Sequence, residues 1–305
     1  MSFNLKILGC NSATPTAWAN PSSQFLNMEE RYFLIDCGEG TQVELRRHKI
    51  KFSRINNIFI SHLHGDHIFG LIGLISTFHM LDRKSQLNIY SPRGLKDLIV
   101  TQLRITQTRL SYFVNFIELT NKEDEIVFED DKVEVSSFPL KHRITCYGFL
   151  FREKPKERKL EIADVEKYNI DKSLYRSIKK GNDVVNEDGI LIENRLITSD
   201  PPKTLSYAYC TDTVYYEKII PSIKGVDLLY HESTFLEDKK ALAKKTGHST
   251  ALDAAKIATL ANVNKLVLGH FSARYKDRSV YLNEALKEFP NTEIAEDGKD
   301  FILTN

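Results

Sequence analysis

The sequence predicts an α/β fold in which β-sheets are covered by helices. In both halves of the 305-residue chain, short apolar runs of strand-like length alternate with segments whose apolar residues recur every three or four positions. Hydrophobic residues make up 42% of the chain, which is enough for a large core in one big domain or two smaller ones. Two successive halves of this kind are typical of sheets with helices on their outer faces.

Turn residues and changes of hydrophobic period separate the expected elements. In the N-terminal half, strands are expected at residues 4–10, 23–28, 31–38, 56–62, 87–91, 115–119, 132–140 and 146–151. A helix is expected at 94–110, because its apolar residues are spaced by three and four and turn residues precede it. In the C-terminal half, strands are expected at 205–212, 226–233 and 264–271, and a helix at 249–263, whose polar start can cap it.

Charge and cysteine content narrow the class of protein. The 42 basic and 41 acidic residues give a formal charge of +1, so any nucleic-acid site must be a local patch. The four cysteines are scattered and form no C-x-x-C pair, which indicates reduced thiols in a cytosolic protein. No signal-like start or apolar stretch of about 20 residues occurs. We therefore expect a soluble, cytoplasmic protein without membrane contact.

The segment from Arg152 to Lys203 differs from the rest of the chain. It is dense in charge and short of continuous apolar runs, as expected of an exposed insertion rather than core. Within it, one stretch carries four basic residues and no acidic one: Lys172, Arg176, Lys179 and Lys180. A solvated charged face is the better explanation of such a run when it is considered alone.

The stretch "FISHLHGDHIFGL" concentrates metal-binding side chains directly after an expected strand. His62, His64, Asp66 and His67 lie within six residues, in a loop that Gly65 allows to turn before a helix begins at "IFGLIGL". A single histidine is usually structural, but four ligand types at this spacing are difficult to explain by packing. Imidazole with carboxylate suits zinc or a similar divalent ion.

Three further residues follow or adjoin other apolar runs: His142, Asp212 and His270. Each one alone is better explained as structural, yet strand ends converge at one edge of a sheet. Together with the first four they make seven ligands, more than the three or four that one zinc ion needs. The sequence therefore predicts two metal ions, with Asp212 as the bridging carboxylate of a dinuclear hydrolase.

H-x-H-x-D-H with a downstream His, Asp and His is similar to the metallo-β-lactamase superfamily, which implies an αββα sandwich. The segments at 33–42, 62–74, 139–149, 231–235, 247–255 and 269–275 resemble, in order, the motifs of short-form ribonuclease Z. This resemblance spans nearly the whole chain. It implies one metallo-β-lactamase-like domain, residues 1–305, in which 152–203 is a flexible substrate-binding arm. It also implies an endoribonuclease that removes the 3′ trailer of precursor tRNA by attack of a dimetal-bound hydroxide, leaving a 3′-hydroxyl on the tRNA and a 5′-phosphate on the trailer.

The resemblance also assigns roles to residues. His62, His64 and His142 would hold one metal, Asp66, His67 and His270 the other, and Asp212 both. The metals would be two Zn²⁺, although Mn²⁺ or iron suits the same ligands. Asp66 would also accept a proton, and Asp36 would orient the metal loop without binding metal. His248 would be the general acid, held and charged by Glu232.

RNA contacts and assembly are implied in the same way. In the family the arm grips tRNA, usually from the opposite subunit of a homodimer, and the basic run at 172–180 fits that role. Ser272 and Arg274, close to His270, are candidate phosphate contacts. Two alternatives remain open: a phosphodiesterase acting on small phosphodiesters or cyclic nucleotides on the same scaffold, and a non-catalytic, metal-stabilised RNA-binding module.

Overall fold

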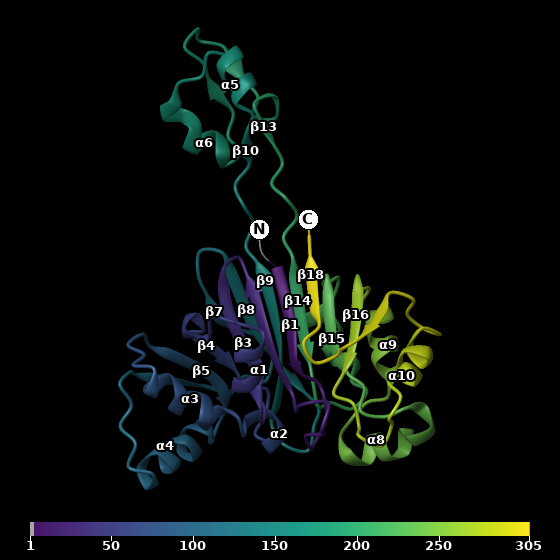
Figure 1. Ribbon diagram of the computed structural model, residues 1–305. Coiled ribbons are helices and arrows are strands. Elements are labelled where there is room, and N and C mark those ends of the chain that lie inside the picture. The colour runs from purple at the N-terminus through teal and green to yellow at the C-terminus, as the bar shows by residue number, and fades with distance from the viewer. Residues whose placement is uncertain (1–2, 305) are drawn as a thin grey trace. The chain divides into compact units, whose positions relative to one another are not determined.

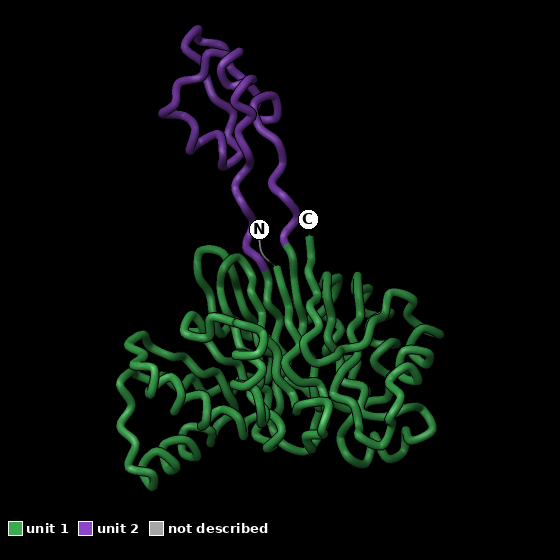
Figure 2. Tube along the Cα trace, viewed as in Figure 1, with its two compact units in different colours: residues 1–152, 205–304 green, residues 153–204, 305 purple. Residues whose placement is uncertain are grey.

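A computed structural model describes residues 3–304 of the chain, which divide into two compact units. The first comprises residues 3–152 and 205–304, and the second is Glu153–Thr204 (Figure 2). No helix among the described residues is long and apolar enough to cross a membrane.

Two seven-stranded sheets form the centre of the first unit, with helices outside them (Figure 1). The strands of the first sheet, in spatial order, are β18 (Asp300–Leu303), β1 (Phe3–Gly9), β2 (Ser23–Met28), β3 (Arg31–Cys37), β4 (Asn57–Phe59), β5 (Leu87–Pro92) and β6 (Val114–Leu119). Those of the second are β17 (Thr292–Ile294), β16 (Lys265–Gly269), β15 (Leu228–Glu232), β14 (Ser206–Cys210), β9 (Cys146–Glu153), β8 (Val133–Leu140) and β7 (Glu125–Glu129). The predicted α/β class with two helix-covered sheets is confirmed.

The helices fall into two groups along the chain. The N-terminal group is α1 (Thr41–Arg47), α2 (Gly65–Ile68), α3 (Leu71–Met80) and α4 (Leu95–Ile105). The C-terminal group is α7 (Ile220–Ile223), α8 (Lys240–Thr246), α9 (Ala251–Leu260) and α10 (Ser279–Ala285). In Figure 1, α1, α3 and α4 lie on the side of β3–β5, and α8, α9 and α10 on the side of β15 and β16.

The main core lies between the sheets and is rich in aromatic residues. Phe59 of the first sheet packs against Phe149 and Phe151 of the second, with ring centroids 5.3 Å apart in both pairs. A separate apolar cluster lies between the first sheet and helices α1, α3 and α4. Burial on both faces explains why β4, β14 and β15 are apolar runs without alternation.

The helix boundaries differ from those predicted in two helices and in the metal motif. The helix expected at 94–110 spans Leu95–Ile105, and the one expected at 249–263 spans Ala251–Leu260. The second begins after Thr250, whose side chain accepts a hydrogen bond from the Asp253 amide and caps it. The metal-motif segment was predicted as a loop before a helix. Instead, α2 begins at Gly65, so that Asp66 and His67 lie on a short helix.

The second unit has a small core of its own. Its elements are β10 (Lys159–Leu160), α5 (Ile162–Lys167), α6 (Tyr175–Lys179), β11 (Val184–Val185), β12 (Leu191–Ile192) and β13 (Thr198–Ser199). Val165, Ile178 and Ile197 are fully buried within it. The buried Asn194 amide donates to the main-chain carbonyls of Ile178 and Asn182, which ties the strands to α6.

Candidate metal centre and active site

The predicted ligands come from strand ends of both sheets. His62 and His64 follow β4, and α2 carries Asp66 and His67. The remaining three residues follow β8, β14 and β16 and are His142, Asp212 and His270. The structure brings all seven together: they fall into clusters whose potential ligand atoms lie within 4.8 Å of one another.

The first cluster contains four atoms at the spacing of a tetrahedral shell. His62 Nε2 lies 3.0 Å from His64 Nδ1, which lies 3.3 Å from His142 Nε2. Asp212 Oδ2 lies 3.4 Å from His62 Nε2 and 3.7 Å from His142 Nε2. A tetrahedral ion with ligand bonds of about 2.0–2.1 Å separates its ligand atoms by about 3.3 Å. These four residues therefore fit one metal ion.

The second cluster uses the other oxygen of the same aspartate. Asp212 Oδ1 lies 3.4 Å from His67 Nε2 and 3.1 Å from His270 Nε2. Asp66 Oδ2 lies 3.5 Å from each of these two nitrogens. The spacing again matches a tetrahedral shell. Asp212 is thus placed to bridge two sites, one on each carboxylate oxygen.

Hydrogen bonds on the far side of the ring fix the orientation of three of the imidazoles. Nδ1 of His142 lies 2.8 Å from the Gly247 carbonyl oxygen, and Nδ1 of His270 lies 2.9 Å from Thr234 Oγ1. Nδ1 of His67 lies 2.7 Å from Asp36 Oδ2. The opposite Nε2 atoms of His67 and His270 are buried and have no hydrogen-bond partner within residues 3–304. Buried nitrogens that are oriented but unpaired are what a metal site requires.

Gly247 ends α8 in a left-handed conformation, with φ of 85°. A Cβ at this position would lie 2.7 Å from His142 Nδ1. Both the dihedral angle and the close approach therefore require glycine.

Asp36 lies between the sheets and contacts His67 from outside the ligand clusters. Its carboxylate accepts hydrogen bonds from the Ser61 amide and hydroxyl and from the Tyr209 hydroxyl of the second sheet. Asp36, Asp212 and His270 have φ angles of 53°, 37° and 57°. Left-handed backbone is costly for residues other than glycine and accumulates at functional sites.

The pKa values of the ligands follow from burial and from their neighbours. Burial lowers the pKa of His62, His64 and His142, so these imidazoles are neutral and can offer a lone pair. Burial also acts on His67, but the carboxylates of Asp66, Asp36 and Asp212 outweigh it and raise its pKa well above the usual value. Metal binding to His67 must therefore release a proton.

His248 and Glu232 form a partly buried ion pair beside both clusters, with the His248 ring centroid 5.2 Å from that of His142 and 5.4 Å from that of His270. His248 Nδ1 lies 2.9 Å from Glu232 Oε1 and 3.9 Å from Asp212 Oδ2. Burial disfavours the imidazolium, but the Glu232 carboxylate outweighs burial and raises the pKa of His248 to about 9. Burial likewise opposes ionisation of Glu232, and the charge of His248 overcomes it, lowering the pKa of Glu232. The pair can hold a proton on His248 at neutral pH.

A cavity of about 430 Å³ opens onto these groups. Ser272 and Arg274 line it, as do Arg143 and the aromatic ring of Phe69, which is 67% exposed. The structure thus places both predicted phosphate contacts at the cavity. The four basic residues Lys172, Arg176, Lys179 and Lys180 belong to the second unit, in and around α6.

Sequence reasoning gave no role to Thr234, which joins the two parts of the site. Its hydroxyl donates to Glu232 Oε2 at 2.6 Å and lies 2.9 Å from His270 Nδ1. The sequence feature that could have indicated a role for Thr234 is its position two residues after Glu232, in the motif at 231–235. The Gly247 carbonyl and the Tyr209 hydroxyl gave no signal, because a main-chain oxygen or a strand tyrosine becomes a supporting contact only through the fold.

Comparison with known proteins places the chain in a family. Residues 3–185 match the family model described as "Anti-Pycsar protein Apyc1". The protein named Ribonuclease Z from Bacteroides thetaiotaomicron is 47% identical over 303 residues, which cover 99% of this chain and 96% of that protein. The protein of the same name from Parabacteroides distasonis is 47% identical over 97% of each chain.

Two solved structures share the fold. The human tRNase Z, short form, has a TM-score of 0.71 and 27% identity over 98% of each chain. The metallo-beta-lactamase fold protein YhfI from Bacillus subtilis has a TM-score of 0.69 and 18% identity, covering 99% of this chain and 100% of that one. The fold is therefore the predicted αββα sandwich of the metallo-β-lactamase type. With these near full-length relatives, the chain belongs to the ribonuclease Z family, and it also falls within the group that the Apyc1 family model describes.

Proposed function

We propose that the protein is a metal-dependent endoribonuclease that removes the 3′ trailer of precursor tRNA, leaving a 3′-hydroxyl on the tRNA and a 5′-phosphate on the trailer. The observation that carries the proposal is a pair of tetrahedral ligand clusters sharing Asp212, next to the charged His248–Glu232 pair. Family membership supplies the substrate class. A pure RNA-binding module needs neither a bridged pair of ligand clusters nor a protonated histidine in the same cavity.

Two divalent cations, zinc foremost, are proposed at the two clusters. His62, His64 and His142 would hold the first, Asp66, His67 and His270 the second, and Asp212 both. When bound, such ions provide Lewis acidity toward a phosphate and lower the pKa of water to near 7. The imidazole and carboxylate donors suit zinc and also accept manganese.

The remaining residues are proposed to position groups and to move protons. His248 donates a proton to the departing 3′ oxygen, since a histidine with a pKa of about 9 is protonated at neutral pH. Glu232 keeps His248 charged and oriented. Asp66 serves as a ligand in the second cluster and accepts a hydrogen bond from the attacking water. Asp36 orients His67 from outside the cluster.

RNA recognition is proposed at two places. Ser272 and Arg274 contact phosphates at the cavity, and residues 152–203 act as an arm whose basic residues Lys172, Arg176, Lys179 and Lys180 contact the tRNA backbone. We further propose a cytoplasmic homodimer. The four cysteines are buried free thiols, as a reducing compartment permits.

The proposal is tested by mapping the ends produced from a trailer-bearing precursor tRNA. We expect one cut next to the discriminator base. This cut should be lost on chelation and in the variant His64→Ala, because His64 supplies one ligand atom of the first cluster. His48→Ala is the matched control, since His48 belongs to none of the ligand clusters. Absence of a cut from a protein that holds two metals per chain would refute the proposal.

Deleting residues 153–204 should separate RNA recognition from chemistry. Cleavage of precursor tRNA is expected to fall by about two orders of magnitude or more, because the deletion removes the four basic residues that are proposed to contact phosphates. Hydrolysis of a small chromogenic phosphodiester should be nearly unchanged, because every ligand lies in the first unit. Equal loss on both substrates would contradict a role of the arm in RNA recognition and would favour a phosphodiesterase of small substrates.

A further inference from the structure

Five cationic side chains form a track along the outside of the loop that carries His142. The cationic track consists of Arg143, Lys141, Lys218, Lys122 and Arg93. All five are exposed. The proposed mechanism uses none of them.

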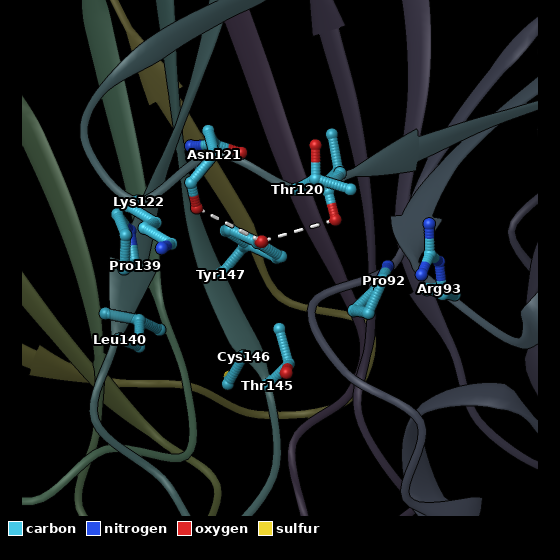
Figure 3. A pocket seen from close by; sticks show the side chains of 11 residues that line it. Pro92, Arg93, Thr120, Asn121, Lys122, Pro139, Leu140, Thr145, Cys146 and Tyr147 are labelled. Atoms are coloured by element: carbon cyan, nitrogen blue, oxygen red, sulfur yellow. Dashed lines mark hydrogen bonds between the residues drawn. The ribbon is translucent and has the colours of Figure 1, made fainter.

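The track begins at the metal site and continues through two hollows. Arg143 lines both the 430 Å³ cavity of the ligand clusters and a hollow of about 860 Å³ around residues 140–145, which Lys141 and Lys218 also line. This hollow shares Leu140 and Thr145 with a third one of about 650 Å³ (Figure 3). Lys122 and Arg93 lie at the rim of the third hollow.

The charged side chains that line the hollows of about 860 Å³ and 650 Å³ are basic. Among the described residues that line them there is no aspartate or glutamate, while Glu123 and Asp124 line an adjoining hollow together with Lys122 and Lys218. Within residues 3–304, the ion pair found for the track joins Arg93 to Glu118 at 3.5 Å, and both side chains are exposed. Exposed pairs of this kind are weak. The positive charge of the track is therefore available to a polyanion.

The walls of the hollow in Figure 3 are fixed rather than loose. The buried Tyr147 hydroxyl lies 3.2 Å from the main-chain carbonyls of Leu119 and Asn121, which it can reach as a donor. Asn121 also pairs with Ser137, through its amide group to the Ser137 carbonyl and through its Oδ1 to the Ser137 hydroxyl. The Tyr147 amide donates to the Ser61 carbonyl, next to the proposed ligand His62. The hollow is thus anchored to the strand end that carries the metal motif.

We propose that the cationic track binds the single-stranded 3′ trailer as it leaves the metal site, an inference that rests on the proposed function. A groove with cations for phosphates and with apolar or aromatic surfaces for base faces is typical of single-strand binding. Ile144, which is 40% exposed, and the half-buried Tyr216 provide such surfaces, and Lys141 Nζ lies 6.0 Å from the centroid of the Tyr216 ring. On the tRNA side of the cut only the discriminator base is unpaired, so a track that spans two hollows fits the trailer.

The test compares precursors that carry trailers of one and eight nucleotides. Lys218→Ala and Lys122→Ala are expected to raise KM for the longer precursor about 3-fold to 10-fold, with kcat unchanged. Cleavage of the one-nucleotide precursor should stay at the wild-type level. Each replacement should also reduce the slope of log KM against log salt by about 0.7, the value for one contact to a single strand.

The order of the residues along the track gives a second readout. Lys218 lines the hollow nearer the metal site and Lys122 the farther one, so the Lys218→Ala effect should begin at a shorter trailer. Lys132→Ala is the matched control, because Lys132 is exposed in the β7–β8 turn, at the opposite end of β8 from His142. If both track variants respond to trailer length as the control does, the inference is wrong. If the wild type cuts neither precursor, the proposed function has failed instead.

Discussion

Asp212→Asn is expected to reduce kcat/KM for precursor tRNA by about 10³-fold or more, which corresponds to about 4 kcal/mol of lost transition-state stabilisation. Asp212 faces four histidine nitrogens at 3.1–3.7 Å, two from each carboxylate oxygen. Burial opposes its ionisation, but these histidines lower its pKa well below the usual value. Asparagine keeps the shape but removes the charge and one acceptor oxygen.

Metal content should fall in parallel with activity in this variant. We expect fewer than two metals per chain by elemental analysis after equilibrium dialysis, while the circular dichroism spectrum stays that of the wild type. Asp300→Asn is a suitable control, because this carboxylate forms an ion pair with Lys6 far along the first sheet from the clusters. An Asp212→Asn protein that retains two metals and full turnover would exclude a shared carboxylate.

His248→Ala is expected to lower kcat on precursor tRNA by about 10²-fold to 10⁴-fold, the usual contribution of a general acid. The 3′ oxygen of a ribose is a poor leaving group and needs a proton. A p-nitrophenolate leaving group does not, so the chromogenic phosphodiester should lose far less activity. A precursor with sulfur in place of the bridging 3′ oxygen should likewise be cut almost normally. Equal loss on all three substrates would mean that His248 does not donate the proton.

Proton donation by His248 also predicts the direction in which kcat changes with pH. Because the pKa of His248 is raised to about 9, the acid form persists through neutral pH, and kcat on RNA should fall as the pH rises through about 9. Glu232→Gln removes the carboxylate that raises this pKa, so the alkaline limb should move to lower pH. A limb that stays in place in Glu232→Gln would assign it to another group.

The clustering of the candidate ligands could be predicted because these residues are of distinctive type and follow strand ends. Four of them lie within six residues, and the other three each follow or adjoin an apolar run. What could not be predicted was the local backbone. α2 is a helix of four residues, too short to produce a periodic signal, so Asp66 and His67 were expected in a loop. Likewise, Thr250 rather than Ser249 caps α9, a choice that the adjacent hydroxyl residues leave undecided.

Supporting contacts were the least accessible to sequence reasoning. Asp36 could be assigned to the surroundings of the metal loop through its motif, but its bond to Tyr209 joins residues 173 positions apart and depends on how the two sheets face each other. The cationic track likewise could not be predicted from the sequence, because it depends on the fold. Arg93, Lys122 and Lys218 lie in three separate segments, each with ordinary composition, and only the fold places them along the same two hollows.

The strand pairing at the base of the second unit has a consequence for how this protein can change. β9 and β14 are adjacent and antiparallel, and Arg152 is the registered partner of Ser206. Residues 153–205 therefore close the gap between neighbouring strands in the way a hairpin loop does. The entropy cost of such a loop rises by only about 0.6 kcal/mol for each doubling of its length. This segment can accordingly lengthen, shorten or be exchanged for an unrelated module without disturbing the sandwich, so new substrates are accessible to the same catalytic body through a single insertion point.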